Sequence, residues 1–166
     1  MFILVISSGA LGTAVFPYFS QMVANRDRKS IVDTLKTYSR LIVLFSLPVT
    51  GLLYFFAQPL VRIIFERGVF TQNDTRQIAS VLAIYGLQIT FYLLSILEVR
   101  LISALQGNHI LMVSAMISLP LNIILNYVFM HFMGVAGIAL STVLVYLMAF
   151  IFLTFMLFKM MATLTQ

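Results

Sequence analysis

Five long apolar stretches occupy most of this 166-residue sequence, and nearly all its charged residues lie between them. The stretches run over about Phe2–Val23, Leu41–Phe56 with an extension toward Phe65, Ile78–Leu105, Ile110–Phe132 and Val135–Phe158. A helix that crosses a bilayer needs ~20 mostly apolar residues. Strands of a membrane barrel would be ~10 residues long with alternating polarity. We therefore expect an all-α, polytopic transmembrane bundle of about five helices, with residues 1–166 forming one transmembrane domain.

The composition excludes several classes of protein. Apolar types make up 61% of the chain and charged types 9%, whereas a soluble domain has ~25% charged residues. A water-soluble enzyme, a disordered chain and a nucleic-acid-binding protein are therefore not expected. Cysteine is absent, which excludes disulfides and thiolate metal sites. His109 and His131 are not spaced with carboxylates as metal ligands would be. With no catalytic motif, we expect neither enzymatic activity, nor a cofactor, nor a metal.

The distribution of basic residues predicts an orientation. If the five stretches all cross the membrane, seven Lys and Arg residues lie on the side of the first loop and three on the other side. The seven are Arg26, Arg28, Lys29, Lys36, Arg40, Arg100 and Lys159. The positive-inside rule then places the C-terminus in the cytoplasm and the N-terminus of this chain outside. Because the first helix would start outside with nothing ahead of it, we expect upstream helices in the full gene.

The two longer loops carry distinct local patterns. Residues Asn25–Tyr38 fit either a solvated basic loop or a short amphipathic helix on the membrane surface, with Ile31, Val32 and Leu35 on its apolar face. In the second loop, Gly68 suits the left-handed position that ends a helix. Thr71 is a good N-cap, and Asp74 three residues later predicts a capping box for the third helix.

A polar stripe follows the fourth apolar stretch. It consists of Ser114, Ser118, Asn122 and Asn126, spaced four residues apart, so it should avoid lipid. Two interpretations remain open. The stripe either hydrogen-bonds to neighbouring helices or lines a water-filled substrate cavity.

Three further features bear on function. Pro17, Pro48 and Pro120 lie inside three different apolar stretches and should bend their helices, as in transporters whose lobes rock. Glu98 is an intramembrane carboxylate, and hence a candidate to bind a proton or a cation for coupling. The alternative is that Glu98 reaches the interface or forms a structural salt bridge. The small pair Gly137 and Ser141 permits close helix contact, as do Ser8 with Gly12 and Gly9 with Thr13.

Three segments together resemble one known family. Gly9–Ser20, Pro59–Thr71 followed by Asp74 and Thr75, and Gly134–Thr142 are similar to segments of the MurJ/MviN-type lipid II flippases. The second segment is the most specific. Its outer-loop motif comprises Glu66, Arg67, Gly68, Phe70, Thr71 and Asp74. Asn122 and Asn126 also suit the family's Asn-containing helix, so the resemblance covers nearly all the chain, within the second lobe of a two-lobe transporter.

The resemblance implies a transporter of the bacterial inner membrane that flips undecaprenyl-linked peptidoglycan precursor by alternating access. Its partners would be membrane lipid, the lipid-linked precursor and the N-terminal lobe. The chain has no basic residue at mid-depth for a pyrophosphate head group, so the other lobe is expected to carry that site. The alternatives are an O-antigen or capsule flippase, a cation-coupled drug antiporter, and a non-transporting subunit or inactive fragment.

Overall fold

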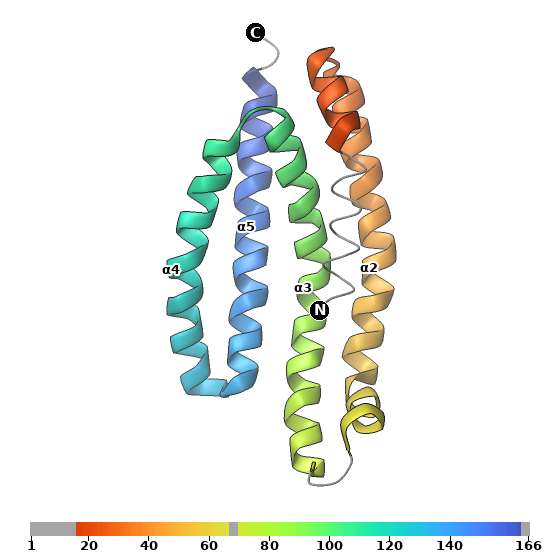
Figure 1. Cartoon of the computed structure of the whole chain (residues 1–166), viewed down its shortest axis with the longest axis vertical. Helices are drawn as coiled ribbons and strands as arrows, with labels where there is room; N and C mark the ends of the chain where they lie inside the picture. Colours follow the sequence, from red (N-terminus) through yellow and green to blue (C-terminus); the bar gives the residue numbers. More distant parts are fainter. Residues whose placement is uncertain (1–15, 67–69, 164–166) are drawn as a thin grey trace.

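The computed structural model describes residues 16–66 and 70–163, and within these ranges the regular structure is all helical. Residues 16–24 are helical, followed by α2 (Arg28–Phe65), α3 (Gln72–Ala104), α4 (Asn108–Met133) and α5 (Val135–Thr163). Four of the described helices, α2 to α5, are long and apolar enough to cross a membrane. α2 lies beside α3, and α4 beside α5 (Figure 1). The predicted all-α bundle is confirmed, although most of the first apolar stretch lies outside the described residues.

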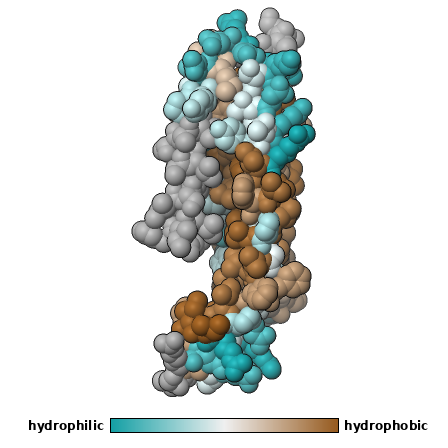
Figure 2. All heavy atoms as spheres, turned by 90° about the vertical axis from the view of Figure 1, so that its right-hand side faces the viewer, coloured by the Kyte–Doolittle hydropathy of each residue, from teal (hydrophilic) through white to brown (hydrophobic). Residues whose placement is uncertain are grey.

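The surface of the bundle is apolar around its middle. On α2, Leu44, Phe55 and Ile63 are 65%, 79% and 71% exposed. Figure 2 shows a hydrophobic band between two hydrophilic ends on one face of the molecule. Such an exposed apolar band would be costly in water and is what lipid contact requires.

α2 begins much earlier than its apolar stretch suggests, so the expected solvated loop at Asn25–Tyr38 is wrong. Asp27 caps the helix by accepting hydrogen bonds from the Ser30 amide at 3.0 Å and from the Ser30 hydroxyl at 2.6 Å. These bonds hold the pKa of Asp27 below its ordinary value, and the bond from the Ser30 hydroxyl has the largest effect. The 38 residues of α2 span about 57 Å at 1.5 Å per residue.

The alternative of a helix in this segment is confirmed from Arg28 onward, but its apolar face does not lie on the membrane surface. Ile31 is 1% exposed and belongs to a core cluster with Phe19 and Leu101. Val32 and Leu35 pack against the same cluster. The apolar face of these first turns is therefore covered by protein rather than by lipid.

Two helix ends are closed by Schellman motifs that contain no glycine at the left-handed position. Arg26 has φ 52° and donates its amide hydrogen to the Val23 carbonyl at 3.0 Å. Gln106 has φ 59°, and its backbone amide donates to the Ser103 carbonyl at 3.0 Å. The backbone amide of Gly107 donates to the Ile102 carbonyl at 2.8 Å. This pattern satisfies the last carbonyls of each helix and makes the next helix follow directly.

The start of α3 follows the sequence prediction. The Thr71 side chain accepts a hydrogen bond from the Asp74 amide, and Asp74 accepts one from the Thr71 amide at 2.9 Å. This reciprocal arrangement is the capping box. The predicted helix end at Gly68 lies outside the described residues, and α2 ends with Glu66 as its C-cap.

Small and polar residues bring the helices close together. The Thr50 hydroxyl donates to the Gly86 carbonyl at 3.0 Å, and Ser46 and Thr90 share a hydrogen bond of 2.9 Å, so α2 and α3 are joined along their contact. At the tight turn between α4 and α5, Gly134 has φ 58°, which favours glycine. A Cβ on Gly137 would lie 2.1 Å from the Phe129 carbonyl oxygen. The expected close contact at Gly137 is thereby confirmed.

Candidate functional site

The polar stripe on α4 forms a hydrogen-bonded joint with α5 at one end. The side-chain amide of Asn126 donates a hydrogen bond to the side-chain oxygen of Asn122 at 2.9 Å. The Ser141 hydroxyl contacts the side-chain oxygen of Asn126. Ser141 is fully buried. Ser114, at the other end of the stripe, is 9% exposed, and Ser118 is half-buried. The contact with Ser141 favours the interhelical interpretation for Asn126, and Asn122 supports it through its bond to Asn126 within α4.

The four prolines lie on exposed faces of continuous helical segments. α2 runs through Pro48 and Pro59, and α4 runs through Pro120. Pro17 lies within the helical residues 16–24, and all four prolines are exposed. The bends expected at Pro17, Pro48 and Pro120 stay predictions.

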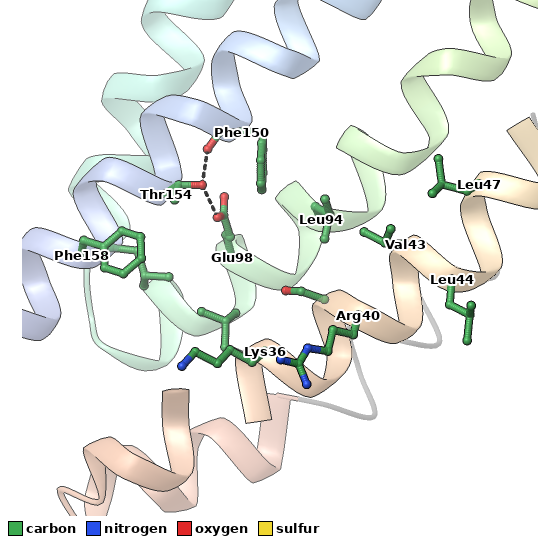
Figure 3. Close-up of a pocket in the computed structure, with 13 residues that line it drawn as sticks. Lys36, Arg40, Val43, Leu44, Leu47, Leu94, Glu98, Phe150, Thr154 and Phe158 are labelled. Atoms are coloured by element: carbon green, nitrogen blue, oxygen red, sulfur yellow. Dashed lines mark hydrogen bonds between the residues drawn. The ribbon is translucent and has the colours of Figure 1, made fainter. Parts of the chain in front are cut away.

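Glu98 is 5% exposed and lies on α3, where it faces α5. Its Oε1 accepts a hydrogen bond from the Thr154 hydroxyl at 2.5 Å, and the Phe150 carbonyl oxygen lies 2.8 Å from the same hydroxyl (Figure 3). Glu98 Oε2 is buried, and among the residues that the structure describes it has no hydrogen-bond partner. Within residues 16–66 and 70–163, no ion pair involves this carboxylate, so the salt-bridge alternative finds no support there.

A cavity of about 570 Å³ opens beside Glu98 between α2, α3 and α5. Lys36, Ser39 and Arg40 line it from α2, and Thr154 lines it from α5. In Figure 3, Lys36 and Arg40 lie on α2, across the cavity from Glu98. The sequence did not reveal these two cations as neighbours of Glu98. Their segment has the polar pattern of a loop, and the cavity forms only when the helices pack against one another.

The outer-loop motif is held together by Glu66. Arg62 Nε lies 3.7 Å from a Glu66 carboxylate oxygen, and the Thr75 hydroxyl donates to the same oxygen at 3.0 Å. The ring of Phe70 lies 6.1 Å from that of Phe65. Arg67 and Gly68 lie outside the described residues. The described part of the motif thus joins the end of α2 to the start of α3.

The part of the chain that the structure describes contains no group of three His, Cys, Asp or Glu side chains placed to hold a metal. His109 and His131 are both exposed, and they lie in α4 near its opposite ends. The polar side chains described above therefore supply hydrogen-bond donors, hydrogen-bond acceptors and charged groups inside a helix bundle.

Comparison with known proteins decides the family. The family model described as "Lipid II flippase MurJ" matches residues 1–166. The chain belongs to the MurJ family. Two curated relatives carry the name "Probable lipid II flippase MurJ": one from Synechocystis sp. is 34% identical over 150 residues, and one from Bdellovibrio bacteriovorus is 31% identical over 137 residues. These matches cover 90% and 82% of this chain.

The MurJ assignment agrees with the fold. A solved structure titled "Lipid II flippase MurJ, inward closed conformation" matches 96% of this chain with a TM-score of 0.75 and 25% identity. This chain spans 35% of that structure, and 28% and 26% of the two curated relatives. The chain is therefore a multi-pass membrane segment that corresponds to a quarter to a third of its MurJ relatives.

Proposed function

We propose that this chain forms part of a non-enzymatic transporter that flips lipid II, a lipid-linked peptidoglycan precursor, across the bacterial cytoplasmic membrane by alternating access. The observation that carries the proposal is the match of the MurJ family model to all 166 residues. The family match favours this substrate over O-antigen lipids and drugs. The chain is one transmembrane domain over residues 1–166, and a further lobe, as a partner, supplies the rest of the pathway and the site for the pyrophosphate.

The proposed orientation places the start of α2 and the end of α5 in the cytoplasm. Both lie at the same end of the bundle (Figure 1). The first four turns of α2 carry Arg28, Lys29, Lys36 and Arg40, and Lys159 lies near the end of α5. This concentration of positive charge supports a cytoplasmic location for that end.

The chain's contribution to transport can be tested by a chimera. In the Bdellovibrio bacteriovorus relative, the matched segment would be replaced by this chain, and the hybrid expressed in cells depleted of their own flippase. We expect growth and exposure of lipid II on the outer leaflet to be restored, because the two sequences are 31% identical over 137 residues. The parent relative and the same relative lacking the segment are the controls.

Expression of this chain alone is a further control. We expect no rescue, because the chain corresponds to only 26% of that relative. A chimera that reaches the membrane in normal amount but exposes no lipid II would contradict the proposal and favour a non-transporting subunit.

Within this function, Glu98 is the proposed coupling residue for a cation or a proton. Support comes from its burial and from Oε2, which has no hydrogen-bond partner within residues 16–66 and 70–163, since an unsatisfied buried carboxylate oxygen is costly. In the chimera, Glu98→Gln is expected to weaken the dependence of flipping on a proton or sodium gradient. Unchanged dependence, measured in vesicles with imposed gradients, would remove Glu98 from this role.

A further inference from the structure

A second cavity, of about 360 Å³, lies where α4 begins and α5 ends. These two helix ends lie at the same end of the bundle (Figure 1). Phe152 and Met156 line the cavity from α5. At 3.6 residues per turn, both project from nearly the opposite side of α5 to Thr154, the residue that contacts Glu98. The second cavity is therefore separate from the one beside Glu98.

α4 and α5 run antiparallel and stay in register from their connecting turn to this cavity. Near the turn, the Ser141 hydroxyl contacts the Asn126 side chain. Nineteen residues further along each helix, Gly107 lies against Met160. A Cβ built on Gly107 would lie 2.7 Å from the terminal methyl carbon of Met160, so the two helix ends are in close contact. Residue numbers on the two helices therefore give the relative heights of their side chains.

The cavity has basic side chains at the end of the bundle and apolar walls toward its middle. In this register the heights of His109 and Lys159 differ by one residue step, about 1.5 Å. Both side chains line the cavity and are exposed. Val113, Phe152 and Met156 continue the lining toward the middle of the helices. Phe152 lies seven residues before Lys159, or about 10 Å along the helix.

No acidic side chain balances the basic groups at this cavity. α4 and α5 contain no Asp or Glu, and none lines the cavity among the described residues. Within residues 16–66 and 70–163, Lys159 makes no ion pair. A ligand suited to this site therefore carries a negative charge with hydrogen-bond acceptors at one end and an apolar part that extends toward the membrane interior.

We propose that this cavity binds an anionic phospholipid whose only charged group is its phosphate, as in phosphatidylglycerol. The phosphate accepts hydrogen bonds from the Lys159 ammonium and from the His109 imidazole, which carries an N–H in either protonation state. One acyl chain lies along Val113, Phe152 and Met156 and continues into the bilayer. Basic pockets between membrane helices are typical sites for anionic lipid heads. The volume of about 360 Å³ is within the range of ordinary ligand pockets, ~300–1,000 Å³.

Zwitterionic lipids and soluble phosphates fit this cavity less well. The heads of phosphatidylcholine and phosphatidylethanolamine carry a positive charge beside the phosphate. With no carboxylate on α4 or α5, that charge would lie near Lys159 without an acidic partner. A soluble phosphate has no acyl chain, so it gains nothing from the apolar walls. The proposal concerns lipid binding alone and does not depend on Glu98 or on whether the chain takes part in flipping.

The test is lipid retention by the purified full chain. The protein would be released into native mass spectrometry from nanodiscs containing equal amounts of phosphatidylglycerol, phosphatidylethanolamine and phosphatidylcholine with the same acyl chains. We expect retained phosphatidylglycerol to exceed each of the other two. Lys159→Gln should lower this excess about fivefold, the effect of one basic residue at an anionic lipid head. His109→Phe keeps an aromatic ring but removes the N–H donor, and it should lower the excess as well.

The matched control is Lys36→Gln, which removes the same charge from the cavity beside Glu98. It should leave the excess of phosphatidylglycerol nearly unchanged. Equal losses in Lys36→Gln and Lys159→Gln would overturn the proposal, because phosphatidylglycerol would then gather through the overall positive charge of this end.

Two measurements on the unaltered protein do not depend on how the variants fold. Phosphatidylmethanol should be retained as well as phosphatidylglycerol, because the phosphate is the group recognised, whereas diacylglycerol should be lost. An excess of glycerophosphoglycerol, which is the same head group without acyl chains, should not displace the bound lipid. Retention of diacylglycerol equal to that of phosphatidylglycerol, or displacement by the soluble head group, would also overturn the proposal.

Discussion

Replacing Gly137 with alanine is expected to destabilise the bundle by about 3 kcal/mol or more, at the upper end of the cost of overpacking a core. The added Cβ would lie 2.1 Å from the carbonyl oxygen of Phe129 and 2.4 Å from its carbonyl carbon. Both are backbone atoms of α4, so no side-chain rotation relieves the clash. α4 and α5 must move apart, which would also stretch the contact between Ser141 and Asn126. Thermal unfolding in detergent, followed by circular dichroism, measures the effect.

Gly51→Ala is the matched control for this substitution. Gly51 lies in α2, and a Cβ there would meet no heavy atom of the described residues within 4 Å. Alanine is a better helix former than glycine by about 1 kcal/mol, so this variant should unfold at the same or a slightly higher temperature. If the two variants behaved alike, the close approach of α4 and α5 would be refuted.

Asn126→Leu is expected to weaken the joint between α4 and α5 by about 1 kcal/mol. It removes the amide that donates to Asn122 and the oxygen that Ser141 contacts. Hydrogen bonds between membrane helices contribute ~0.6 kcal/mol on average and up to ~2. The measurement is again the unfolding temperature in detergent, together with lipid II exposure by the chimera described above.

Two further variants distinguish the structural joint from a cavity lining. Asn126→Gln retains an amide oxygen for Ser141 and an amide donor for Asn122, and it should lose less stability than Asn126→Leu. Ser118→Ala changes the same stripe at a half-buried position and should leave stability nearly unchanged. If Asn126→Leu instead abolished flipping at full stability, the cavity interpretation would be correct for Asn126.

The spanning helices were predictable because lipid contact demands long apolar segments. The start of α3 was predictable because Thr71 and Asp74 form a local capping box. The start of α2 was not predictable from the sequence. Its preceding turn places Arg26 in the left-handed region, and a sequence pattern that expects glycine there gives no sign that one helix ends and another begins at once.

The candidate site was predictable only in part. Glu98 stands out in sequence because a carboxylate in an apolar stretch is costly. Its partner Thr154 is 56 residues away, and the cations across the cavity belong to a segment without an apolar pattern of spanning length. Asn122 and Asn126 were identified as a stripe, but their link to Ser141 depends on the sharp turn at Gly134. Such contacts are set by packing between helices, which a single sequence does not display.

The length of α2 has a mechanical consequence. At about 57 Å, its 38 residues exceed the ~30 Å hydrocarbon core, and the helix continues through Pro48 and Pro59 without interruption. Its basic first turns are fixed to the core through Ile31, and its last turn is tied to α3 through Glu66 and Thr75. Because Ser46 and Thr50 also bond to α3 between these two ends, α2 and α3 are held together along their length. A displacement at one end of this pair would therefore reach the other end through the same two helices, with no separate signal carried between them.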